Sequence, residues 1–88
     1  MYYVYIIKSQ KTGSYYIGSS SHVDLRVERH NGGWTKSTKN KGPWSLVYRE
    51  EIPSKSAALK REKQIKLKKS RIYIEKLISK TRAEVVPI

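Results

Sequence analysis

Two segments near the N-terminus decide the fold: Tyr2-Tyr3-Val4-Tyr5-Ile6-Ile7-Lys8 and Ser14-Tyr15-Tyr16-Ile17-Gly18-Ser19. Both are rich in aromatic and β-branched residues, which favour strands. The residues between them, Ser9 to Gly13, are polar and end in glycine. Two strands joined by a turn of this length predict a β-hairpin. Because both strands are nearly apolar throughout, we expect this hairpin to be central in its sheet and covered on each face.

The hairpin is followed by a predicted helix over residues 22–30. Its start, Ser21-His22-Val23-Asp24, has the spacing of a capping box with Asp in place of Glu. Its end, Asn31-Gly32-Gly33, consists of residues that tolerate a left-handed C-terminal cap. The sequence therefore predicts a short helix with both ends marked.

The rest of the chain predicts one further strand and two helices. In order, these are a mobile basic loop over residues 32–43, a strand over 44–49, a helix from its cap Ser54 to about Lys69, and a helix over about 70–80. Short connections favour an antiparallel sheet with helices packed on it. We expect an α+β fold of order β-β-α-β-α-α, with one domain over residues 1–82 and a frayed tail over 83–88.

Length and composition exclude several classes of protein. A chain of 88 residues is too short for two domains. Its longest apolar run, Tyr2 to Ile7, is far below the ~20 residues of a membrane helix, and no signal peptide is visible. Cysteine is absent, which excludes disulfides and thiolate metal sites. We expect a cytoplasmic protein with no membrane association.

The charge of the chain indicates an anionic partner. Nineteen Lys and Arg against seven Asp and Glu give a net charge of +12. Residues 55–82 contribute nine of these charges, because they hold eleven basic side chains and only two acidic ones. A basic field this dense favours nucleic acid. The alternative is a solvated basic face that serves solubility.

Tyrosines gather in the predicted hairpin. The strand period of two places Tyr3 and Tyr5 on one face, and Tyr16 of the neighbouring strand can reach that face. Phenylalanine is absent, so every phenyl-sized ring carries a hydroxyl. Strand tyrosines usually serve packing, and the pattern alone leaves packing and chemistry open.

The first predicted helix offers a second candidate. Arg26 and His30 are four residues apart and share one face, flanked by Val23 and Val27. This spacing brings a basic pair out beside the core. The structural alternatives are a surface cation for Arg26 and, for His30, a residue that favours the helix C-terminus.

Glu62 is the third candidate. It falls with Ala58 and Ile65 on the apolar stripe of the predicted 54–69 helix. A carboxylate that faces inward must be paired, hydrogen-bonded or metal-bound. Lys66, Arg61 and Lys63 are the nearby cations, so an ion pair remains the alternative to a metal site.

Taken in chain order, these features resemble a known family. They are Tyr3-Val4-Tyr5, Tyr16-Ile17-Gly18, Arg26, His30 and Glu62. This order resembles the GIY-YIG nuclease superfamily, whose signature is two such tripeptides on adjacent strands, a helix with Arg and His four apart, and a metal-binding Glu on a later helix. The second tripeptide is unchanged, whereas the first has Tyr3 where glycine is usual.

The resemblance covers residues 1 to about 70. Residues 30–34 and 42–44, together with Ala58-Leu59 and Glu62, are similar to the catalytic subunit of structure-specific junction endonucleases. They are equally similar to small stand-alone bacterial members of the superfamily. The chain is also similar to the N-terminal nuclease domain of the bacterial excision-repair system.

The resemblance implies a metal-dependent endonuclease that hydrolyses DNA phosphodiester bonds, in repair or recombination. Tyr5 would deprotonate the attacking water, Tyr16 would hydrogen-bond the nucleophile, Arg26 would clamp the phosphate, His30 would orient Tyr5 or relay a proton, and Glu62 would hold one Mg²⁺ or Mn²⁺. Gly18 would let backbone or substrate approach closely. We expect the five side chains to converge on one concave face. Only one of seven acids lies on an inward stripe, which argues against a two-metal site.

Nucleic acid would be held by basic residues of two segments. These are Lys36, Lys39 and Lys41 of the 32–43 loop and Lys63 and Lys66 of the later helix, acting through phosphate contacts. Trp34 would stack on an unpaired base or fold back onto the core. The expected partner is branched or structured DNA. The alternative function is a non-catalytic nucleic-acid-binding protein on the same scaffold.

Overall fold

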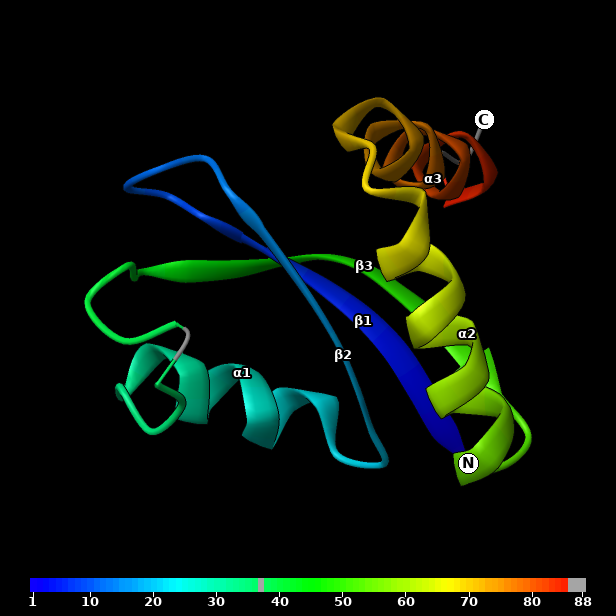
Figure 1. The fold of residues 1–88 in the computed structure, drawn as a ribbon, viewed down its shortest axis with the longest axis horizontal. Coiled ribbons are helices and arrows are strands. Elements are labelled where there is room, and N and C mark those ends of the chain that lie inside the picture. The colour runs from blue at the N-terminus through cyan, green and yellow to red at the C-terminus, as the bar shows by residue number, and fades with distance from the viewer. Residues whose placement is uncertain (37, 86–88) are drawn as a thin grey trace.

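The computed structural model describes residues 1–36 and 38–85, with side chains described through residue 80. The elements are β1 (Tyr2–Ser9), β2 (Tyr15–Ser20), α1 (Val23–Asn31), β3 (Trp44–Ile52), α2 (Lys55–Lys68) and α3 (Arg71–Val85). This order confirms the predicted β-β-α-β-α-α arrangement and the α+β class (Figure 1). Among the described residues, no helix is long and apolar enough to cross a membrane.

The sheet has three antiparallel strands in the order β2-β1-β3. Only β1 is central, because β3 pairs with it along its whole length, from Tyr2 opposite Ile52 to Ser9 opposite Trp44. The expectation that both strands of the hairpin are central is therefore wrong for β2, which forms an edge. That edge becomes important for the candidate site.

Alternate residues of β1 face two different cores. Val4 and Ile6 pack with Ala58 and Ile65 of α2 on one face, and α3 covers the same face. Tyr5 and Ile7 face the opposite way, toward α1. Burying one such aliphatic side chain contributes about 1.5–3 kcal/mol, so each face anchors its own helix. Figure 1 shows α1 and α2 on opposite sides of the strands, with β2 between them.

The start of α1 differs from the prediction. The N-cap residue is His22, and no side chain caps the helix. The serines act before the helix instead, because Ser20 Oγ accepts the His22 N–H at 2.9 Å and the Ser21 hydroxyl contacts His22 Nδ1 at 2.9 Å. The predicted capping box at Ser21 is therefore wrong.

The other helix ends agree better with the sequence. Ser54 caps α2 by accepting the Ala57 N–H at 3.3 Å, as predicted. After α1 the left-handed residue is Gly33, with φ of 78°. Helix α3 continues to Val85 instead of ending near Lys80, so the predicted frayed tail overlaps its last turn. Residues 86–88 of that tail lie outside the described residues.

Candidate active site

Tyr5 and Gly18 are opposite each other in the β1–β2 register. The Tyr5 ring is fully buried and lies across Gly18. A Cβ atom added to Gly18 would lie 2.5 Å from Tyr5 Oη and 2.7 Å from Cζ. Glycine is needed here because the tyrosine ring itself occupies the space. We expected backbone or substrate to approach Gly18 closely. In the structure, the group that approaches Gly18 is the Tyr5 side chain.

His30 lies in the last turn of α1 and is 1% exposed. Its Nε2 is 3.0 Å from Tyr5 Oη. The Tyr16 ring packs against the imidazole with centroids 4.7 Å apart. The two tyrosines and the histidine predicted from sequence therefore share one buried cluster on the α1 face of the sheet. His30 does more than favour a helix end.

Thr38 completes the surroundings of His30. Its hydroxyl is 2.9 Å from His30 Nδ1, and the residue is 1% exposed. Trp44 Nε1 donates to the Thr38 carbonyl at 3.1 Å. The 32–43 loop, predicted as mobile, is thus anchored near its middle. The sequence held no signal for this role, because nothing distinguishes Thr38 from the other polar loop residues.

Asn31 anchors the same loop from its other side. Its carbonyl oxygen accepts the Trp44 N–H at 2.5 Å, and its amide donates to the Trp44 carbonyl at 3.1 Å. The sequence suggested only a helix-end role for this residue. It instead joins the end of α1 to the start of β3, and so fixes the loop that carries Thr38.

The electrostatics of the cluster favour uncharged groups. Burial raises the pKa of Tyr5 above its ordinary value, and the Arg26 charge opposes this only in part. Burial and the Arg26 charge together lower the pKa of His30. Both side chains are therefore neutral at pH 7. The half-buried Arg26 is the cation whose charge acts on the pKa of both.

Glu62 reaches the cluster from the opposite face. It lies on α2, where Ser19 Oγ donates to its Oε1 at 2.7 Å and Lys66 Nζ to its Oε2 at 2.6 Å. Lys66 Nζ is also 6.0 Å from the centre of the Tyr16 ring. The Glu62 charge is the smallest of the influences that raise the pKa of Tyr5, which is set mainly by burial.

The five predicted side chains thus lie on both faces of the sheet around strand β2, and not on one face. Tyr5, Tyr16, Arg26 and His30 belong to the α1 side, whereas Glu62 comes from the α2 side. The expectation of a single concave face is corrected in this respect. The physical reason is that α1 and α2 pack on opposite faces of the sheet.

A metal ion would have one carboxylate to bind. Within the described residues, no group of three or more His, Cys, Asp or Glu is placed to hold a metal. The Glu62 carboxylate is 18% exposed and already carries a cation, the Lys66 ammonium, on one oxygen. A single hard oxygen ligand fits Mg²⁺, which keeps several waters and takes substrate phosphate oxygens. The alternative ion pair with Lys66 is also present, so the two roles compete for one carboxylate.

The residues expected to hold nucleic acid are exposed. They are Trp34, Lys36, Lys39 and Lys41 of the loop and Lys63 and Lys66 of α2. Trp34 is 77% exposed and does not fold back onto the core. The Arg29 guanidinium lies 5.8 Å from its ring centroid. An exposed indole beside a cation is suited to stacking on a base.

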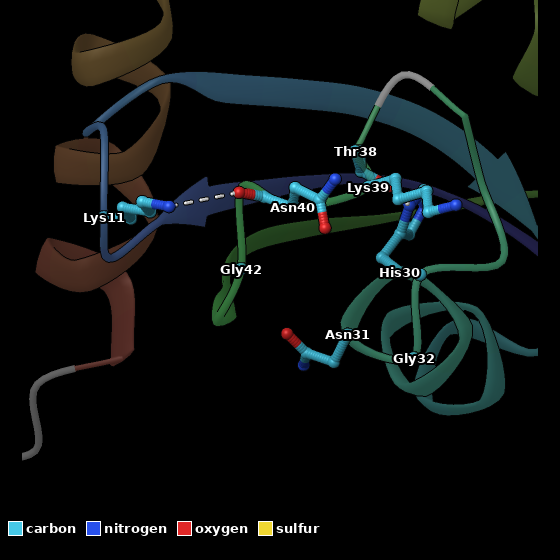
Figure 2. A pocket seen from close by; sticks show the side chains of 9 residues that line it. Lys11, His30, Asn31, Gly32, Thr38, Lys39, Asn40 and Gly42 are labelled. Carbon is cyan, nitrogen blue, oxygen red and sulfur yellow. Dashed lines mark hydrogen bonds between the residues drawn. The ribbon is translucent and has the colours of Figure 1, made fainter.

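A polar cavity of about 730 Å³ lies behind His30. Figure 2 shows His30, Thr38 and Lys39 on one side of it, and Lys11 with Asn40 on the other. Lys11 Nζ donates to the Asn40 carbonyl at 3.5 Å. Lys11 was not selected from the sequence, because it belongs to the hairpin turn and only the fold brings it to the loop.

Comparison with known proteins gives consistent results. The family described as GIY-YIG catalytic domain matches residues 1–81. The UPF0213 protein SSP2268 of Staphylococcus saprophyticus is 46% identical over 66 residues, which are 74% of this chain and 79% of that protein. A UPF0213 protein of Staphylococcus aureus is 48% identical over the same shares. The solution NMR structure of the UPF0213 protein BH0048 from Bacillus halodurans has a TM-score of 0.55 and 38% identity, and covers 90% of this chain and 84% of its own.

Proposed function

The chain belongs to the GIY-YIG catalytic-domain family, and on this basis we propose that it is a metal-dependent endonuclease that hydrolyses DNA phosphodiester bonds. The family is of the nuclease type, implies a DNA substrate, and generally uses a divalent metal. One observation carries the proposal for this chain. Tyr5 and His30 pair beside Tyr16 of strand β2 on the α1 face, and the Glu62 carboxylate contacts Ser19 of the same strand from the α2 face.

Tyr5 and His30 would move the proton of the attacking water. A phenol with a raised pKa is a poor base unless its own proton has an acceptor. His30 Nε2, 3.0 Å from the hydroxyl, would be that acceptor. The phenol O–H bond breaks as an N–H bond forms on His30, and the phenolate takes a proton from water. The water oxygen would attack phosphorus, the bond to the leaving oxygen would break, and that oxygen would take up a proton from solvent, to which His30 would return the proton that it received.

Arg26 and Glu62 would act on the phosphate. The planar Arg26 guanidinium suits two phosphate oxygens better than an ammonium does. Glu62 would hold the Mg²⁺ or Mn²⁺ ion, which when bound neutralises developing negative charge. Tyr16 would contact the nucleophile from β2. Lys66 would compete with a metal ion for the Glu62 carboxylate, and once displaced it would be available to a phosphate.

The two basic segments would hold the nucleic acid on either side of strand β2. Loop residues Lys36, Lys39 and Lys41 lie beyond the end of α1, whereas Lys63 and Lys66 lie on α2. Phosphate contacts of this kind orient a strand without reading its sequence. Branched or structured DNA as the preferred substrate, repair or recombination as the process, and the cytoplasm as the location belong to this proposal.

The alternative is a protein that binds nucleic acid on this scaffold without cutting it. The ion pair of Glu62 with Lys66 favours that function, because it satisfies the carboxylate without a metal. Both functions predict binding that weakens as salt rises. Only the nuclease predicts cleavage that requires a divalent ion.

The test is a nicking assay on supercoiled, flapped and branched DNA with Mg²⁺ or Mn²⁺. Tyr5→Phe removes the hydroxyl and keeps the ring, and should lower the rate by roughly 10²–10⁴-fold. Tyr48→Phe is the matched control, because Tyr48 is a buried strand tyrosine whose hydroxyl donates to Glu50 at 2.7 Å. A folded wild-type chain that nicks none of these substrates with either ion would leave the binding function in place.

A further inference from the structure

The hydrogen-bond partners of Tyr5 determine the direction of its bond to His30. Tyr5 is fully buried, and its hydroxyl carries one proton. Arg26, its cationic neighbour, offers only donors. His30 Nε2, at 3.0 Å, is therefore the acceptor of the Tyr5 proton. An imidazole nitrogen that accepts a hydrogen bond carries no hydrogen itself.

The proton of neutral His30 then lies on Nδ1, which faces Thr38. Nδ1 donates to Thr38 Oγ1 at 2.9 Å. The Thr38 hydroxyl keeps its own proton for the Thr35 carbonyl, an acceptor only, at 3.3 Å. When Tyr5 donates to His30, His30 to Thr38 and Thr38 to the Thr35 carbonyl, each of the three protons has one acceptor. The reverse order would leave the buried Tyr5 proton without a hydrogen-bond acceptor among the described side chains, which costs about 1–3 kcal/mol.

We propose that Thr38 is a positioning residue that holds His30 in the Nδ1–H tautomer and so keeps Nε2 free to take the proton of Tyr5. Thr38 touches neither substrate nor the reacting atoms. Its importance for catalysis rests on the proposed function, whereas its effect on the tautomer does not. The role depends on an acceptor oxygen at this position, and not on the bulk of the side chain.

The position of Thr38 also couples the base to the basic loop. Thr38 belongs to the same loop as Trp34 and Lys39, and its carbonyl is held by the indole of Trp44. Figure 2 shows Thr38 and Lys39 adjacent to His30. A change in the loop therefore reaches His30 through one hydrogen bond.

The first test is the tautomer of His30 in the wild-type chain, read by nitrogen-15 NMR of the imidazole at a pH where it is neutral. The chain has two histidines, so His22→Gln assigns the signals. We expect the proton on Nδ1. A proton on Nε2 overturns the proposal, whatever the nicking assay shows. This measurement needs no variant of Thr38 and so does not depend on how such a variant folds.

The second test compares three variants. Thr38→Val keeps the shape but removes the acceptor, so the Nδ1–H population should fall and any nicking rate should drop about 10–100-fold, as for other orienting partners of histidine. Thr38→Ser should restore both readouts. Thr12→Val, in the exposed hairpin turn, should leave both unchanged.

The two hypotheses fail in different ways. An unchanged tautomer in folded Thr38→Val overturns the role of Thr38, even if the chain is a nuclease. A shifted tautomer that Thr38→Ser restores, in a chain that nicks no DNA, supports the role of Thr38 and removes the proposed function instead.

Discussion

The two faces of the central strand β1 differ in kind. On the α2 face, Val4 and Ile6 pack among aliphatic side chains of the helix. On the α1 face, Tyr5 is hydrogen-bonded to the buried His30, which is hydrogen-bonded to the buried Thr38. Successive residues of one strand thus have different structural roles. The strand period of two places the aliphatic residues and the tyrosine of β1 on opposite faces.

The tyrosines of the two faces make the difference concrete. Tyr48 is buried on the α2 face and donates to the Glu50 carboxylate, and burial and this contact raise its pKa to about 12. A carboxylate beside a phenol holds it protonated. Tyr5 donates instead to a neutral imidazole, which can accept a proton. Hydrogen-bond partner, more than burial, separates the structural tyrosine from the candidate base.

The largest effect should come from Glu62, the one acid that reaches the edge from the α2 face. Glu62→Gln keeps the shape of the side chain and removes the charge that would hold a metal. The rate of metal-dependent nicking should therefore fall at least about 10³-fold, which corresponds to several kcal/mol of lost charge stabilisation. DNA binding should persist or tighten slightly, because a negative charge is lost. Glu75→Gln is the matched control, since Glu75, like Glu62, is paired with a basic side chain one turn away, here Arg71 at 3.1 Å. Equal rates for both variants would remove Glu62 from the site.

The next effect should fall on stability and not on chemistry. Ile65 is 1% exposed in the α2 core, so Ile65→Ala should lower the free energy of unfolding by about 2–5 kcal/mol. Leu67→Ala on the same helix, where Leu67 is 66% exposed, should change it by less than about 0.5 kcal/mol. Urea unfolding followed by circular dichroism measures both. Similar losses from both variants would contradict the described orientation of α2.

A smaller effect is expected at Trp34, outside both cores. Trp34→Ala should weaken binding of single-stranded or flapped DNA by about 1–3 kcal/mol, the value of one stacked base. Stability should hardly change, because the side chain is 77% exposed. Trp34→Tyr should retain much of the affinity, and Ile72→Ala, at 67% exposure on α3, serves as the control. Fluorescence anisotropy at fixed salt gives the affinities, and equal affinities for the wild type and Trp34→Ala would exclude stacking there.

The smallest effect concerns pH and separates the two faces once more. The pKa of His30 is lowered by burial and by Arg26 from its usual 6.5. The unfolded chain therefore binds a proton at His30 where the folded chain does not, so stability should fall as pH drops below 6.5 and level off below the folded pKa. Denaturant unfolding between about pH 5 and pH 7.5 measures this slope. The slope should shrink in His30→Asn and persist in His22→Gln.

Local patterns accounted for much of the fold. The alternation of β1 placed Tyr3 and Tyr5 on one face, and the i, i+4, i+7 stripe placed Glu62 with Ala58 and Ile65, because strand and helix periods depend on neighbouring residues only. The helix caps were harder to predict from the sequence. The spacing around Ser21 suggested a capping box, but its hydroxyl bonds to His22 instead. Local alternatives of similar energy compete for such hydroxyls.

The sequence by itself determined the order of the elements, the family, and the apolar stripe of α2 on which Glu62 lies. Only the tertiary structure decided that β3 pairs with β1, which leaves β2 as the edge strand whose Ser19 contacts Glu62. It also decided that Glu62 pairs with Lys66 while Arg61 turns to Glu50 at 2.8 Å. Burial of Thr38 behind His30 was decided in the same way. These outcomes depend on contacts between residues distant in the chain, and the energy of such contacts is not contained in any local period.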